Sequence, residues 1–143
     1  MIGPGTGIAP FRAFLNERQA AGATGRNWLF FGHQRSNCDF FYEDELTSMY
    51  SAGFLTKLSL AWSRDNDQKI YVQHRMREAG RDLWSWIEDG AHIYVCGDAQ
   101  RMAKDVETAL AEIIAERGGH KPAEAMKILG GLKASNRYQA DVY

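Results

Sequence analysis

The stretch Ala91-His92-Ile93-Tyr94-Val95-Cys96-Gly97-Asp98 is a short apolar run that ends in a glycine and a carboxylate. Aromatic and β-branched residues dominate the run, so we predict a buried strand over residues 91–96. The next residues, 99–117, carry apolar side chains at helical spacing and stop at Gly118-Gly119. A strand followed at once by an amphipathic helix is the unit that builds parallel α/β sheets.

The same alternation extends through the rest of the chain. Further strands are predicted at residues 27–32, 55–62 and 138–143. Helices are predicted at residues 10–21, 39–52, 72–89 (with a break at Gly80) and 123–133. We therefore predict one α/β domain over residues 1–143, with a doubly wound, mainly parallel, five-stranded Rossmann-like sheet and helices on both faces. Only Met1 and Ile2 precede the first turn, so we expect the first strand to be largely missing and the chain to be a C-terminal fragment.

The composition excludes several classes of protein. With 17 basic and 18 acidic residues the formal charge is −1, whereas a nucleic-acid or anionic-membrane surface needs an excess of basic residues. No stretch approaches the roughly 18 apolar residues of a membrane span. Cys38 and Cys96 form no C-x-x-C pair, which argues against a disulfide framework or a zinc site and favours a cytoplasmic protein. The histidines show no ligand spacing, so we predict surface or structural roles for His33, His74, His92 and His120.

A glycine-rich turn, Gly3-Pro4-Gly5-Thr6-Gly7-Ile8-Ala9-Pro10, lies between the end of a strand and the start of a helix. Glycines let the backbone approach a diphosphate closely, and N–H groups at a helix start attract its charge. Pro10 suits the first turn of the helix, where a missing N–H costs nothing. The spacing departs from the G-x-G-x-x-G dinucleotide fingerprint, and an ordinary glycine-rich turn is the alternative interpretation.

Polar residues that suit a phosphate monoester follow the strand that ends at Trp62. They supply a hydroxyl, two cations, an aromatic ring and an amide, and they are Ser63, Arg64, Lys69, Tyr71 and Gln73. Cations bind phosphate through charge-assisted hydrogen bonds, and an aromatic ring can stack on adenine. An acidic residue in this place suits a free 2′-hydroxyl instead. The alternative is a solvated charged loop, which Asp65 and Asp67 partly neutralise.

The carboxyl ends of parallel strands are the usual ligand sites of such sheets, and further candidates lie there. Gly97 permits close approach of a ligand, and Asp98 can cap the helix that we predict from Ala99. For Cys96 the alternative is a small buried hydrophobe, and for Tyr143 it is a frayed end. We expect three segments to converge on one edge of the sheet, namely residues 3–10, 63–73 and 96–99.

These segments occur in the order seen in one family. The motifs are Gly-Pro-Gly-Thr-Gly-Ile-Ala-Pro-Phe-Arg at 3–12, Phe-Phe-Gly at 30–32, Ser-Arg at 63–64, Lys-x-Tyr-Val-Gln at 69–73, Tyr-Val-Cys-Gly-Asp at 94–98 and Asp-Val-Tyr at 141–143. Over essentially its whole length the chain resembles the NADP-binding domain of the ferredoxin–NADP reductase superfamily, in its diflavin reductase branch. Within that branch it is most similar to the flavoprotein subunits of bacterial sulfite reductases. Residues 33–38 depart from those subunits and resemble an arginine-containing loop seen elsewhere in the branch.

The resemblance implies that one group of residues binds the phosphates and adenosine of NADPH. The glycine turn is expected to line the pyrophosphate through Gly5, Thr6 and Gly7. The 2′-phosphate and adenosine are expected to contact the residues that follow Trp62, namely Ser63, Arg64, Lys69, Tyr71 and Gln73. Arg35 is expected to add a phosphate contact.

The resemblance also implies a hydride-transfer site. Cys96 is expected beside the nicotinamide C4, from which hydride leaves, with Gly97 and Asp98 near the nicotinamide ribose. Asp141 is expected to stabilise the positive charge that develops on the nicotinamide. Tyr143 is expected to stack on the FAD ring until the nicotinamide displaces it.

The implied function is the NADPH-binding module of a diflavin reductase. Electrons pass in that family from NADPH through FAD and FMN to the sulfite reductase haemoprotein, and the FAD and FMN domains precede this segment, so we expect the fragment alone to be inactive. One alternative is a reductase for another haem acceptor, such as cytochrome P450. A non-catalytic NADPH-binding module is the other, and Asp141 and Tyr143 speak against it because a mere binder has no use for a flavin-stacking residue.

Overall fold

The computed structural model describes residues 1–143 and has an α/β fold with parallel strands. The chain divides into two compact units, Met1–Val72 and Gln73–Tyr143, each of which is described by itself. None of the helices combines the length and the apolar character needed to cross a membrane.

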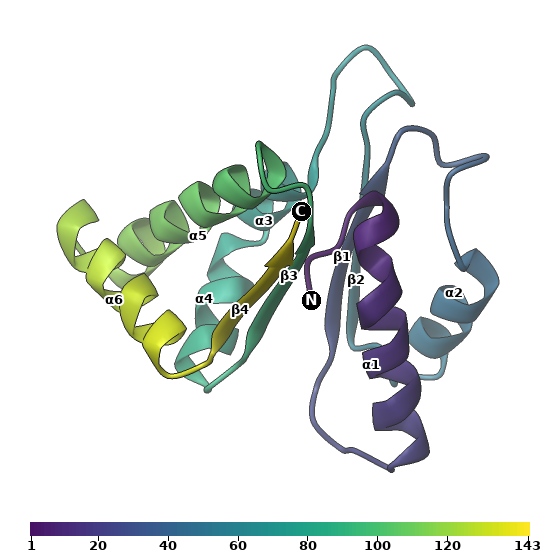
Figure 1. The fold of residues 1–143 in the computed structure, drawn as a ribbon, viewed down its shortest axis with the longest axis horizontal. Coiled ribbons are helices and arrows are strands. Elements are labelled where there is room, and N and C mark those ends of the chain that lie inside the picture. Colours follow the sequence, from purple (N-terminus) through teal and green to yellow (C-terminus); the bar gives the residue numbers. More distant parts are fainter. The chain divides into compact units, whose positions relative to one another are not determined.

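The first unit holds a pair of parallel strands with two α-helices (Figure 1). Its elements are the 3₁₀ helix η1 (Gly5–Ile8), α1 (Ala9–Ala20), β1 (Trp28–His33), α2 (Glu43–Ser51) and β2 (Lys57–Trp62). The register of the pair runs from Trp28 opposite Lys57 to His33 opposite Trp62. The carboxyl ends of both strands therefore lie side by side, as the sequence predicts.

The expected first strand is present as a single parallel bridge between Ile2 and Phe30. The N–H of Gly3 donates to the Phe30 carbonyl (3.0 Å), and the Phe30 N–H donates to the Met1 carbonyl (2.9 Å). These bonds hold the start of the glycine turn against β1.

The core of the first unit explains a correction to the predicted helix at residues 39–52. Phe31, which is fully buried, lies 5.9 Å from the ring of Phe40 and 6.0 Å from that of Phe41. Packing of these two rings holds residues 40–41 outside any helix, and Tyr42 adopts a left-handed conformation with φ +58°. The helix α2 consequently begins at Glu43, four residues later than predicted.

The second unit contains a second parallel strand pair and most of the helices. Its elements are α3 (Val72–Glu78, which begins at the last residue of the first unit), α4 (Gly80–Glu88), β3 (Ile93–Gly97), α5 (Met102–Gly118), α6 (Pro122–Ala134) and β4 (Tyr138–Val142). The predicted break near Gly80 is confirmed, because Ala79 leaves the helical conformation between α3 and α4. Helix α5 packs against α4, α6 and β3 (Figure 1).

Arg137 holds the start of β4 in place. Its Nη2 donates to the Ile87 carbonyl at 2.6 Å, and its Nε donates to the Ala91 carbonyl at 3.2 Å. The Ile93 N–H in turn donates to the Arg137 carbonyl at 2.7 Å. Because the strands are parallel and in register from Ile93 and Tyr138 onward, this anchor sets which β4 residue lies beside Cys96.

Candidate functional site

The glycine turn favours glycine at two positions, for different reasons. A Cβ placed on Gly3 would lie 2.4 Å from the Gly7 carbonyl oxygen and 2.6 Å from Phe11 Cδ2. Gly5 has φ +58°, in the left-handed region. The Gly7 N–H donates to the Pro4 carbonyl (3.1 Å), so this amide is already engaged within the turn.

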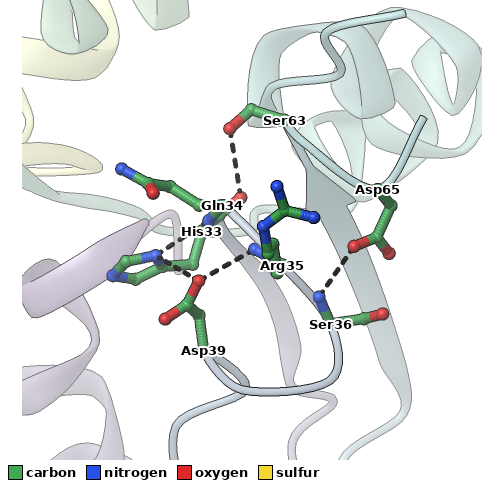
Figure 2. A network of polar contacts seen from close by, with 7 residues as sticks. All are labelled: His33, Gln34, Arg35, Ser36, Asp39, Ser63 and Asp65. Carbon is green, nitrogen blue, oxygen red and sulfur yellow. Dashed lines mark hydrogen bonds and ion pairs between the residues drawn. The ribbon is translucent and has the colours of Figure 1, made fainter. Parts of the chain in front are cut away.

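The loops that follow β1 and β2 are joined by hydrogen bonds (Figure 2). The Ser63 N–H donates to the His33 carbonyl at 3.0 Å, and the Arg64 N–H donates to the Gln34 carbonyl at 2.8 Å. The Ser63 hydroxyl makes only a long contact, 3.4 Å, with the His33 carbonyl. The structure thus brings Ser63 and Arg64, both predicted site residues, against the loop that carries Arg35.

Two carboxylates hold the Arg35 loop in shape. Asp39 Oδ2 accepts the Arg35 N–H at 2.9 Å, and Asp65 Oδ1 accepts the Ser36 N–H at 2.9 Å. Hydrogen bonds from the Ser36 side chain and then from its N–H lower the pKa of Asp65. Asp65 therefore links the loop after β2 to the loop after β1, in addition to partly neutralising the positive charge of its own loop. The Arg35 and Arg64 side chains remain exposed.

The remaining residues predicted for the adenosine end lie farther along the chain. Lys69 is exposed, and the Tyr71 side chain is 44% exposed. Gln73 begins the second unit, where its Nε2 donates to Asp105 Oδ2 at 3.3 Å. The roles of these three residues stay predictions.

In the second unit, Cys96 on β3 lies directly opposite Asp141 on β4. Cys96 is buried, and burial followed by the nearby charge of Asp141 raises the pKa of its thiol. The side chain is consequently a neutral thiol beside a carboxylate. That state does not suit a nucleophile, which needs the thiolate.

Tyr143 is anchored by its backbone although its side chain is 67% exposed. Its N–H donates to the Gly97 carbonyl (3.1 Å), and its carbonyl accepts the Ala99 N–H (2.9 Å). Gly97 has φ +140°, which disfavours any side chain. The structure therefore brings Cys96, Gly97, Asp141 and Tyr143 together at the carboxyl ends of β3 and β4.

Asp98 closes a turn rather than capping a helix from Ala99, which corrects the prediction. Its carboxylate accepts the N–H groups of Arg101 (2.7 Å), Met102 (3.1 Å) and Gln100 (3.3 Å). These bonds stabilise a turn over residues 99–101, so α5 begins only at Met102. They also lower the pKa of Asp98, the bonds from Arg101 and Met102 most.

Replacing Asp98 by asparagine should lower the melting temperature at neutral pH. A carboxyl whose native pKa is depressed contributes stability above its ordinary pKa, 3.8, and loses it as pH falls through the native value. The difference in melting temperature between wild type and Asp98→Asn should therefore shrink in acid. Thermal unfolding followed by circular dichroism across that range checks it, and a difference that does not change with pH would contradict the assignment.

The sequence prediction missed the residues that shape the cluster after β1. His33, Gln34 and Asp39 all make hydrogen bonds or close contacts there (Figure 2). Their one signal in the sequence is position, since His33 directly follows the strand predicted at residues 27–32, just as Ser63 follows the strand predicted at residues 55–62. The contacts of the His33 ring with Gln34, Asp39 and Phe41 fit the structural role that the sequence predicts as one of two alternatives.

Residues 1–108 match the oxidoreductase NAD-binding domain family. The chain belongs to that family. The matched residues of this NAD-binding domain include the glycine turn, the Ser63–Arg64 pair and Cys96 to Asp98.

Individual relatives align with all 143 residues of the chain, including Asp141 and Tyr143. The chain is 59% identical over 143 residues to the sulfite reductase (NADPH) flavoprotein alpha-component of Klebsiella pneumoniae. Identity is 58% to the protein of the same name from Cronobacter sakazakii and 57% to that from Photorhabdus laumondii. In each case the chain spans 24% of the relative's length.

Proposed function

We propose that residues 1–143 form an NADP(H)-binding domain with one five-stranded parallel sheet, on which the three candidate segments converge. The domain binds NADPH and takes part in hydride transfer to FAD in a cytoplasmic diflavin reductase, whose electrons pass through FMN to a sulfite reductase haemoprotein. The observation that carries the proposal is the exposed Arg35 and Arg64 pair, held with Ser63 at the ends of β1 and β2.

The residues of this cluster fit a phosphate monoester. Two exposed guanidinium groups supply planar, permanently charged donors, which suit phosphate oxygens. The Ser63 hydroxyl can leave its 3.4 Å contact at little cost and donate to the same oxygens. The nearby carboxylate of Asp65 accepts the Ser36 N–H through Oδ1, which ties this acidic side chain to the Arg35 loop. We infer preference for NADPH over NADH, with Lys69, Tyr71 and Gln73 completing the adenosine end.

The glycine turn fits a diphosphate by close approach. Beside Gly5 a missing Cβ leaves an open space, and Gly5, Thr6 and Gly7 can border the phosphates there. Since the Gly7 N–H bonds to Pro4, Gly7 contributes room rather than a donor. The Arg35 guanidinium adds charge from the neighbouring loop.

The carboxyl ends of β3 and β4 fit the nicotinamide end. NADPH, when bound, supplies a hydride from its nicotinamide ring. The Asp141 carboxylate stabilises the positive charge that forms as hydride leaves, and the neutral Cys96 thiol lies beside it without forming a covalent bond. Gly97 leaves room for the ring, and the Asp98 turn borders the ribose. Tyr143, fixed by its backbone, can cover the flavin with its exposed side chain.

The larger assembly is proposed from the relatives' name. They are called NADPH flavoprotein components of sulfite reductase, and the chain spans 24% of their length. We infer that FAD and FMN belong to other domains of the full-length protein and that a haemoprotein subunit is its partner.

In the full-length flavoprotein, Cys96→Ala should slow flavin reduction by about tenfold or more while NADPH affinity stays nearly constant. The thiol is proposed to act in the transition state, and each tenfold corresponds to about 1.4 kcal/mol of lost stabilisation. Stopped-flow flavin reduction and a titration with NADP⁺ separate the two effects. Reduction at the wild-type rate would remove Cys96 from the hydride-transfer site.

Tyr143→Ala should strengthen binding of the nicotinamide end and relax the preference for NADPH. A ring that must be displaced subtracts its stacking energy, about 0.5–1.5 kcal/mol, from cofactor binding, which is roughly a 2- to 10-fold effect. NADH gains relatively more, because it lacks the 2′-phosphate that helps drive displacement. The measurement is the ratio of kcat/KM for NADPH and NADH, with Tyr143→Phe as the control that keeps the ring. An unchanged ratio in the alanine variant contradicts the flavin-stacking role.

A further inference from the structure

His33 ends β1, and its imidazole is not among the groups proposed to contact the dinucleotide. Its ring lies beside the glycine turn, since a Cβ placed on Gly5 would lie 3.9 Å from His33 Cδ2. Apart from the adjoining residues and the backbone of η1, no other atom comes within 4 Å of that position. Gly5 therefore borders an open space, and the nearest wall of that space is an edge of the imidazole.

Three neighbours fix the orientation of the ring. Nδ1 accepts the Gln34 N–H at 2.8 Å, and Asp39 Oδ2 lies 3.5 Å from the same nitrogen. The ring of Phe41 packs edge-on with a centroid distance of 5.0 Å. Figure 2 shows Nδ1 turned toward Gln34 and Asp39 and the second nitrogen, Nε2, pointing away from them.

This arrangement places a hydrogen on Nε2 in either charge state. In the neutral ring Nδ1 accepts a hydrogen bond, so the proton is on Nε2. In the protonated ring Nε2 keeps its hydrogen, and the new Nδ1–H faces the Asp39 carboxylate. Nε2–H makes no hydrogen bond to another residue, and the side chain is 26% exposed. Nε2–H is therefore an oriented donor that solvent or a ligand can reach.

We propose that His33 Nε2 donates a hydrogen bond to the diphosphate of the bound dinucleotide at the glycine turn. The inference rests on the proposed function and adds a contact to it. Nε2 is bonded to Cδ2, so the donor adjoins the ring edge that faces Gly5. Such a donor adds to what the turn itself offers, since the Gly7 N–H is already bonded to the Pro4 carbonyl.

Calorimetric titration of the whole chain with three ligands tests the contact. NADP⁺ carries both the diphosphate and the 2′-phosphate, NAD⁺ carries only the diphosphate, and 2′-AMP carries only the 2′-phosphate. His33→Leu should weaken NADP⁺ and NAD⁺ by about tenfold, the value of one hydrogen bond to a charged group, and leave 2′-AMP unchanged. His33→Gln, whose amide is also a donor, should recover most of the loss. His120→Leu, in the second unit, is the matched control and should change none of the three.

Each other outcome has a definite meaning. Unchanged NADP⁺ affinity in His33→Leu overturns the contact. Equal losses for NADP⁺ and 2′-AMP overturn it too, because His33 then supports the whole cluster rather than the diphosphate. If His33→Leu unfolds, as judged by circular dichroism, His33→Gln decides through its ratio of NADP⁺ to 2′-AMP affinity compared with His33→Asn, whose shorter amide should not reach. A wild-type chain that binds neither NADP⁺ nor 2′-AMP refutes the proposed function itself, and this contact with it.

Discussion

Replacing Arg64 and Lys69 together by alanine should weaken NADPH binding by about 10²- to 10⁴-fold and leave NADH binding nearly unchanged. Each cation is proposed to make a charge-assisted contact with the 2′-phosphate, worth about 1.5–3 kcal/mol, and every 1.4 kcal/mol is about tenfold in affinity. The Arg64 backbone is held by the Gln34 carbonyl at 2.8 Å, so removal of its side chain should leave the loop in place. Isothermal titration with each cofactor measures both changes.

The control removes the same charge from the same unit. Arg26 precedes β1 and Lys57 begins β2, so both lie at the amino ends of the strands, opposite to the candidate site. Arg26→Ala combined with Lys57→Ala should barely change the ratio of NADPH to NADH affinity. Equal losses of affinity for NADPH and NADH in the Arg64/Lys69 variant would mean that these cations stabilise the fold or bind the diphosphate, and that they do not contact the 2′-phosphate.

Gly3→Ala should destabilise the chain by about 3 kcal/mol, the upper end of typical overpacking costs, and abolish measurable NADPH binding. The new methyl would lie 2.4 Å from the Gly7 carbonyl oxygen, which belongs to the backbone and cannot rotate away. Phe11, whose Cδ2 would lie at 2.6 Å, is buried and has little room to move. The turn must then move off β1, which breaks the bond from the Gly3 N–H to the Phe30 carbonyl.

Urea unfolding checks this prediction, and Gly130→Ala is its control. Gly130 is exposed within α6, and a Cβ there would meet no atom within 4 Å. Alanine at this position should stabilise the chain by about 0.5–1 kcal/mol, because glycine has the poorer helix propensity. A stable Gly3→Ala variant that binds NADPH normally would contradict the prediction, because the backbone of the turn could then move to accommodate the methyl group.

Local sequence patterns predicted the elements well where burial and periodicity agree. The run at 27–32 became the buried strand β1. The apolar stripe at 99–117 became α5, which ends at Gly118 and is capped by Gly119 with φ +69°. The predicted helix starts were wrong where a specific side-chain contact competes with helical periodicity. Helix α2 starts late because Phe40 and Phe41 pack on Phe31, and α5 starts late because the Asp98 carboxylate stabilises a turn first.

In the candidate site, too, residue positions were predictable from local sequence, whereas the contacts between loops were not. The positions of Ser63, Arg64 and Cys96 at or just after strand ends were predictable from the alternation of strands and helices along the chain. The hydrogen bonds from Arg64 to Gln34 and from Ser36 to Asp65 were not, since they join loops separated by about thirty residues of sequence. The anchoring of Tyr143 by Gly97 and Ala99 likewise depends on how β4 pairs with β3.

The sequence by itself determined the parallel α/β class, the residues of the glycine turn and the residue types at each strand end. It could do so because strand and helix periodicity, glycine conformational freedom and residue charge are properties of short segments. The tertiary structure alone decided that Asp65 holds the Arg35 loop, that Asp141 lies beside Cys96, and that His33 presents Nε2 next to Gly5. Those facts depend on strand register and on contacts between loops, which are set by the packing of the whole unit and not by any local run of residues.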